Sequence, residues 1–270
     1  MDENAMTGVV MGGLFVLTLV LFITKDRRKD NIFGSLRSQI TPVKSAYIEI
    51  LKKYFPFYKR LNAVDQKKFE KKLHQFIAAK KFIPRDIEAI TPEMKTLIAA
   101  AAVQLTFGLP KVYLSHFKRI LVYPDSYYST INRTYHKGEV NPRYGMIVLS
   151  WKNFVEGYID CTDSMNLGLH EMAHALRFEN LIKNGEHNFF DPNTLAEWER
   201  RSTQIVNDMA AGRNSFFRDY AMTNREEFFA VAVENFFERP EGFQEAMPKL
   251  YRLMCKLLNQ DPVQLYQLNK

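Results

Sequence analysis

Cysteine is nearly absent from this chain of 270 residues, which contains only Cys161 and Cys255. Two cysteines this far apart provide neither a disulfide framework nor the spacing of a cysteine metal cluster, so nothing about them demands an oxidising compartment. Internal repeats and low-complexity tracts are also lacking, which excludes a solenoid or a repeat array. The length instead indicates one or two domains with a sizeable core.

Charge is missing from residues 4–24, a stretch rich in valine, leucine and phenylalanine. About 20 apolar residues suffice to cross a bilayer as a helix. Asp2 and Glu3 precede the stretch and no small-residue cleavage site follows it, which argues against a cleaved signal peptide. The basic run at residues 25–29 places the rest of the chain in the cytoplasm by the positive-inside rule. We therefore expect residues 1–24 to form a single-pass membrane anchor, in a bacterial inner membrane, with the body of the protein cytoplasmic.

Positive charge is concentrated next to this predicted anchor. Residues 25–81 contain sixteen basic and five acidic residues, whereas residues 82–270 contain twenty-one and twenty-three. The anionic inner leaflet is the natural partner of such a region, with simple solvation of lysine-rich faces as the alternative. Because no nucleic-acid recognition motif accompanies the charge, no nucleic-acid partner is expected. We interpret residues 25–53 as a basic juxtamembrane linker.

Residues 168–176 contain the motif His-Glu-x-x-His within a sequence typical of a buried helix. On a helix, His170 and His174 lie one turn apart on one face and can present two ring nitrogens to one metal ion. Imidazole ligands and an open fourth position suit catalytic zinc. Glu171 can then act as the base that takes a proton from a metal-bound water. The alternative is a helix whose two histidines share a face by chance.

A second helix supplies candidates for the missing third ligand. Thr223 or Asn224 can cap this helix, which is expected to end at Arg239 because a proline follows. Glu227 and Glu234 lie two turns apart on a stripe of small and apolar residues, so both carboxylates are predicted to face inward. An inward carboxylate requires a proton or a cation, and the metal is the obvious cation.

The remaining pattern indicates an α-rich α+β fold with a small sheet. Residue 91 is a threonine followed by proline, the signature of a helix start. The strand predicted at residues 145–151 lies shortly before the metal helix. It is either a substrate-binding edge strand or an ordinary sheet strand. The other predicted elements are helices at residues 61–77, 93–105 and 195–211 and a strand at residues 120–123.

The combination of His170, Glu171 and His174 with Tyr220 and Glu227 resembles the Mlc titration factor A family of zinc-dependent peptidases. The distal arrangement is also similar to the catalytic domain of anthrax lethal factor. The resemblance covers residues 54–262 and implies a gluzincin-like peptidase domain, which we place at residues 54–270.

Carried over residue by residue, the resemblance implies that His170, His174 and Glu227 bind zinc and that Glu171 is the general base. Tyr220 would stabilise the oxyanion of the tetrahedral intermediate or donate a proton to it. The family commonly has aspartate three residues after the second histidine, where this chain has Arg177.

The sequence therefore predicts a membrane-anchored zinc metallopeptidase that hydrolyses peptide bonds of a peptide or protein substrate. One alternative is a zinc-containing regulatory protein that sequesters a transcription regulator or another cytoplasmic partner. A second is a basic membrane-surface adaptor whose metal motif is vestigial.

Overall fold

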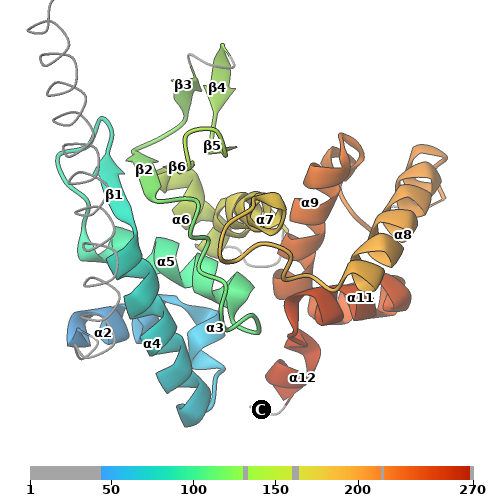
Figure 1. Ribbon diagram of the computed structural model, residues 1–270, viewed down its shortest axis with the longest axis horizontal. Helices are drawn as coiled ribbons and strands as arrows, with labels where there is room; N and C mark the ends of the chain where they lie inside the picture. Colours follow the sequence, from blue (N-terminus) through green and yellow to red (C-terminus); the bar gives the residue numbers. More distant parts are fainter. Residues whose placement is uncertain (1–43, 130–132, 160–163, 214–215, 268–270) are drawn as a thin grey trace, which may run out of the picture. The chain divides into compact units, whose positions relative to one another are not determined.

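A computed structural model describes residues 44–129, 133–159, 164–213 and 216–267 of the chain (Figure 1). Within it, Val43–Lys270 forms one unit by its internal contacts. The predicted anchor at residues 1–24, and the predicted linker up to residue 43, lie outside the described residues. Among the described helices none is long and apolar enough to cross a membrane.

The first helices pack around α5, which is buried along almost its entire length. Thr91 caps α5 by accepting a hydrogen bond from the backbone N–H of Met94, and Pro92 occupies the first turn, as predicted. The alanines at residues 99–102 are fully buried, and their small side chains allow α2, α4 and α7 to pack closely against this helix. The helices of this part are α2 (Ser45–Tyr54), α3 (Pro56–Lys59), α4 (Ala63–Ala79) and α5 (Pro92–Thr106).

A four-stranded sheet has the strand order β1-β2-β6-β5, in which the first three strands are parallel and β5 is antiparallel to β6. The predicted strand at residues 145–151 is β6, which pairs on both sides and is therefore an ordinary sheet strand. The edge strand beside it is β5, a segment that was not predicted to form a strand. The strands are β1 (Lys81–Pro84), β2 (Arg119–Tyr123), β5 (Gly138–Asn141) and β6 (Met146–Ser150), with a separate hairpin of β3 (Tyr127–Ser129) and β4 (Thr134–His136).

The C-terminal half is helical, and proline stands in the first turn of several of its helices. The helix predicted at residues 195–211 corresponds to α8. These elements are α6 (Trp151–Ile159), α7 (Leu167–Leu181), α8 (Pro192–Ala210), the 3₁₀ helix η1 (Asp219–Met222), α9 (Arg225–Glu238), α10 (Pro240–Ala246), α11 (Pro248–Leu258) and α12 (Pro262–Gln267).

Helices α7 and α9 pack against each other in the core (Figure 1). Most residues of both helices are buried, including the apolar run from Phe228 to Val233 in α9. The many helices and the small mixed sheet confirm the predicted α-rich α+β class. Polar side chains that project from α7 toward α9 are therefore enclosed and must find partners there.

Candidate metal centre

The two histidines of the His-Glu-x-x-His motif converge on one point from α7. Asn166 caps this helix by accepting a hydrogen bond of 2.9 Å from the backbone N–H of Leu169. His170 and His174 then follow one turn apart, and their Nε2 atoms lie 3.1 Å from each other. This confirms that the motif is helical and that both rings share one face.

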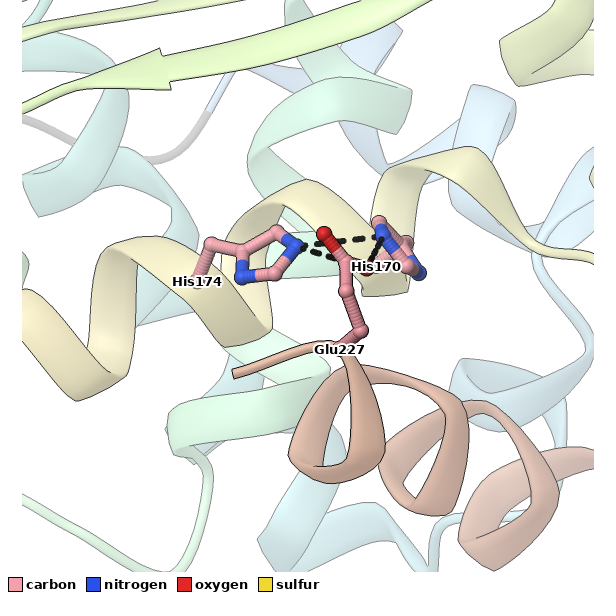
Figure 2. A group of neighbouring side chains, drawn as sticks. All are labelled: His170, His174 and Glu227. Carbon is pink, nitrogen blue, oxygen red and sulfur yellow. Dashed lines mark hydrogen bonds and ion pairs between the residues drawn. The ribbon is translucent and has the colours of Figure 1, made fainter. Parts of the chain in front are cut away.

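Glu227 reaches the same point from the first turn of α9 (Figure 2). Asn224, and not Thr223, caps α9 by accepting a hydrogen bond of 2.9 Å from the backbone N–H of Glu227. The Oε2 atom of Glu227 lies 3.0 Å from Nε2 of His170 and 3.4 Å from Nε2 of His174. Two caps set by asparagine thus bring the carboxylate and the two imidazoles together.

The three converging atoms have the chemistry of a metal site. One nitrogen or oxygen from each of His170, His174 and Glu227 lies within 4.8 Å of the others. Oε2 of Glu227 is buried and accepts no hydrogen bond of good geometry from the residues that the structure describes. Lone pairs that face one another in a buried space repel unless a cation or a proton lies between them. These residues therefore fit a metal ion with nitrogen and oxygen ligands.

The electrostatics of the cluster favour positive charge. Burial of His170 disfavours its charged form, but the close Glu227 and Glu234 carboxylates outweigh this effect and raise the pKa of His170 to about 10. Burial likewise disfavours the charged form of Glu227. Its contacts with His170 and His174 nevertheless hold the pKa of that carboxyl well below its usual range. A bound cation would take the place of the proton held between these groups.

Glu171 lies beside the cluster and is 5 % exposed. Burial raises the pKa of its carboxyl, while His170 and His174 act in the opposite direction. Edge strand β5 passes directly over it, because a Cβ added at Gly138 would lie 2.6 Å from Cδ of Glu171. The carboxylate is therefore confined between α7 and the edge strand.

Tyr220 lies in η1, the turn that leads into α9, as its position ahead of the Asn224 cap predicts. Its ring centroid lies 6.0 Å from that of His170, and the residue is 49 % exposed. Burial and then the neighbouring Glu227 carboxylate raise the pKa of its hydroxyl above the ordinary value. The hydroxyl thus remains protonated at neutral pH and is able to donate a hydrogen bond.

Glu234, the other inward carboxylate of α9, does not face the cluster. Its Oε1 lies 2.7 Å from Nδ1 of His170, on the opposite side of the ring from Nε2, and also accepts a hydrogen bond from Arg218. The sequence stripe predicted that Glu234 is inward but not which group it contacts. No sequence signal marked Arg218, which lies outside any motif.

Arg177 stands where aspartate was expected from the family resemblance, and its described contacts do not include His170 or His174. Its guanidinium bonds to Glu199 of α8 at 2.5 Å and lies over the ring of Phe229, 5.3 Å from its centroid. Arg177 of α7 therefore contacts α8 through an ion pair and α9 through a cation–π interaction.

Comparison with known proteins agrees with this arrangement. Residues 24–258 match the family described as glucose-regulated metallo-peptidase M90. The chain is 27% identical over 237 residues to the uncharacterized protein slr2042 of Synechocystis sp., covering 82% of this chain and 86% of that protein. It is also 27% identical over 233 residues to Mlc titration factor A of Yersinia pestis and of Yersinia pseudotuberculosis, covering 77% of this chain and 82% of each relative. With nearly its whole length matched, the chain belongs to the glucose-regulated metallo-peptidase M90 family.

Proposed function

We propose that this protein is a zinc-dependent peptidase in which His170, His174 and Glu227 hold the metal. The observation that carries the proposal is the convergence of two Nε2 atoms and a buried Oε2, directly beside a buried glutamate. Among the described residues this Oε2 accepts no hydrogen bond of good geometry. Membership of a metallo-peptidase family supports the same activity. Zinc is preferred because two imidazoles and one carboxylate form the ligand set of well-known catalytic zinc sites.

A zinc ion held by His170, His174 and Glu227 would supply Lewis acidity, which lowers the pKa of water and polarises a carbonyl oxygen. Glu171 then accepts the proton of the attacking water and later returns it to the leaving amine, because its carboxylate lies next to the ligands and is shielded from bulk solvent. Tyr220 donates a hydrogen bond to the oxygen that becomes negatively charged, a role that its protonated hydroxyl can fill.

The edge strand β5 gives the substrate a place to bind. Its inner edge pairs with β6, and it has no further strand neighbour in the described sheet. An extended peptide that pairs with this free edge would run beside Gly138, where an added Cβ would meet the Glu171 side chain. The scissile bond would thus lie within reach of the base.

For the cellular location, we propose that residues 1–24 anchor the chain in a bacterial inner membrane with the catalytic unit in the cytoplasm. The support is the uncharged apolar stretch and the basic residues that follow it.

A second candidate function is the capture of a regulator with or without proteolysis. The relatives from Yersinia are named Mlc titration factor A, a name that states the titration of another protein, Mlc. Under this second proposal, the chain would bind a cytoplasmic regulator comparable to Mlc.

Metal analysis of the purified full-length protein tests the proposal. We expect one zinc per chain, loss of hydrolysis of an unfolded protein substrate on chelation, and recovery on addition of zinc. Protein that contains stoichiometric zinc but does not hydrolyse any of a broad set of peptides would favour the regulatory function. Absence of zinc would indicate a vestigial motif.

A further inference from the structure

Glu234 is held by donors on both of its oxygens. Oε1 lies 2.7 Å from Nδ1 of His170 and accepts a hydrogen bond of 2.7 Å from Nη2 of Arg218. Oε2 accepts hydrogen bonds from Nη1 of Arg218 at 3.0 Å and from the backbone N–H of Asn166 at 2.8 Å. The residue is 1 % exposed. The carboxylate is therefore fixed in place, and it is not free to act as a metal ligand.

Contact with Glu234 determines which ring nitrogen of His170 carries a proton and which one faces the metal site. A carboxylate with these donors is an acceptor only, so the nitrogen of His170 that faces it must carry a proton. The other nitrogen, Nε2, then points toward His174 and Glu227 (Figure 2). Carboxylates that bind a ligand histidine in this way fix both its tautomer and the orientation of its ring.

Arg218 in turn holds Glu234 and ties three segments together. Its guanidinium forms two parallel bonds to the carboxylate and also donates a hydrogen bond to the backbone oxygen of Ser164, just before α7. The backbone of Arg218 begins η1, where its carbonyl accepts from the N–H of Ala221 at 2.9 Å. The Arg218 guanidinium therefore connects three segments: the start of α7, the middle of α9 and the turn that carries Tyr220.

We propose that Arg218 and Glu234 are a pair of positioning residues: Glu234, fixed by Arg218, holds the His170 ring so that Nε2 is presented to the metal. The inference rests on the proposed function, because that proposal identifies the metal as zinc. The quantity that it predicts is the affinity for zinc and not the rate of hydrolysis. Two independent features support it, namely the short contact with Nδ1 and the saturation of both carboxylate oxygens by donors.

Zinc affinity of the full-length protein tests the proposal through two variants. Glu234→Gln keeps the shape of the side chain but removes its charge. Because a partly buried guanidinium that has lost its carboxylate can destabilise the fold, a double variant that combines Glu234→Gln with Arg218→Met removes both charges together. Glu226→Gln is the matched control, since this glutamate lies in the same helix and is exposed. The dissociation constant of zinc is measured by competition with a chelator, and the visible spectrum of cobalt-substituted protein reports the ligand geometry.

We expect zinc binding that is weaker by about 10–100-fold in Glu234→Gln and in the double variant, with an altered cobalt spectrum. The control should match the wild type in both measurements. A purely structural pair would lower the melting temperature of the metal-free protein and leave zinc affinity and the cobalt spectrum of the folded variants unchanged, and that result would overturn the proposal. If Glu234→Gln does not fold, the double variant decides.

The outcome is separate from that of the proposed function. A wild-type protein that binds zinc without hydrolysing peptides would contradict the peptidase function, and the affinity comparison would still decide the role of Glu234. A wild-type protein that binds no zinc would overturn both proposals.

Discussion

Gly138 lies against Glu171 so closely that no larger residue fits there without movement of the carboxylate. A Cβ at residue 138 would lie 2.6 Å from Cδ and 2.7 Å from Cγ of Glu171, distances that real Cβ atoms essentially never show. The absence of a side chain on the edge strand thus leaves room for the base of the proposed mechanism.

Replacement of Gly138 by alanine should therefore impair catalysis selectively. The added methyl group pushes the Glu171 carboxylate away from its position, and a misplacement of about 1 Å can cost about 100-fold in rate. We expect kcat to fall by about this factor while zinc content stays at one per chain. Gly185, where an added Cβ would contact nothing within 4 Å, provides the control. Equal activity of the Gly138→Ala and Gly185→Ala variants would show that residue 138 does not restrict the base.

Replacement of Glu227 by alanine should sharply lower zinc affinity, whereas replacement of the adjacent Glu226 should not. A helix turns by about 100° per residue, so the two carboxylates point in different directions. Glu226 is exposed, and Oε2 of Glu227 lies 3.0 Å from Nε2 of His170. Titration with zinc against a chelator measures the difference. Equal loss of zinc in the two variants would mean that Glu227 is not the third ligand.

The Tyr220→Phe variant should keep its zinc and its melting temperature and lose most of its turnover. Removal of one hydrogen-bond donor to an oxyanion typically costs about 10²–10³ in kcat. The alternative role of Tyr220 is packing of its ring against Phe217 or Phe228. In the described residues the ring lies beside His170 instead, and the residue is 49 % exposed. Steady-state kinetics on a good peptide substrate should show a fall in kcat with little change in KM. A variant with near-normal kcat would remove Tyr220 from the mechanism.

Deletion of residues 1–24 should move the protein from the membrane fraction to the soluble fraction, because it removes the uncharged apolar stretch. In intact spheroplasts, protease added from outside should leave the catalytic unit undigested, as the basic residues after the stretch favour the cytoplasmic side. Digestion of the unit from outside would refute this orientation.

The convergence of two imidazoles on one helix face could be predicted from the sequence because its signals are local. A motif with a fixed spacing identifies His170 and His174, and Thr223 or Asn224 marks the start of α9. Such caps depend on hydrogen bonds between residues three apart, so they can be recognised without knowledge of the fold. The same is true of the threonine and proline that start α5. The choice of Glu227 over the other inward glutamate of α9 comes from the family resemblance and not from a local signal.

The edge strand and the support of His170 depend on contacts between distant residues. Strand β5 has only four residues, and each of them is partly exposed, so it has no alternating pattern to reveal it. Its place at the edge follows from pairing with β6. Glu234 and His170 are 64 residues apart in the chain. The stripe on α9 indicated an inward carboxylate, but only the packing of α7 on α9 identifies its partner.

The turnover of the Glu171→Gln variant is the most direct test of the central claim, that these residues form a working zinc peptidase. Glutamine has the shape of glutamate but cannot accept the proton of the water, and general base catalysis contributes about 10²–10⁴-fold. We expect the variant to bind one zinc per chain with unchanged affinity and to lose hydrolysis by at least the lower of these factors. A zinc-loaded Glu171→Gln protein that hydrolyses peptides at the wild-type rate would contradict the account.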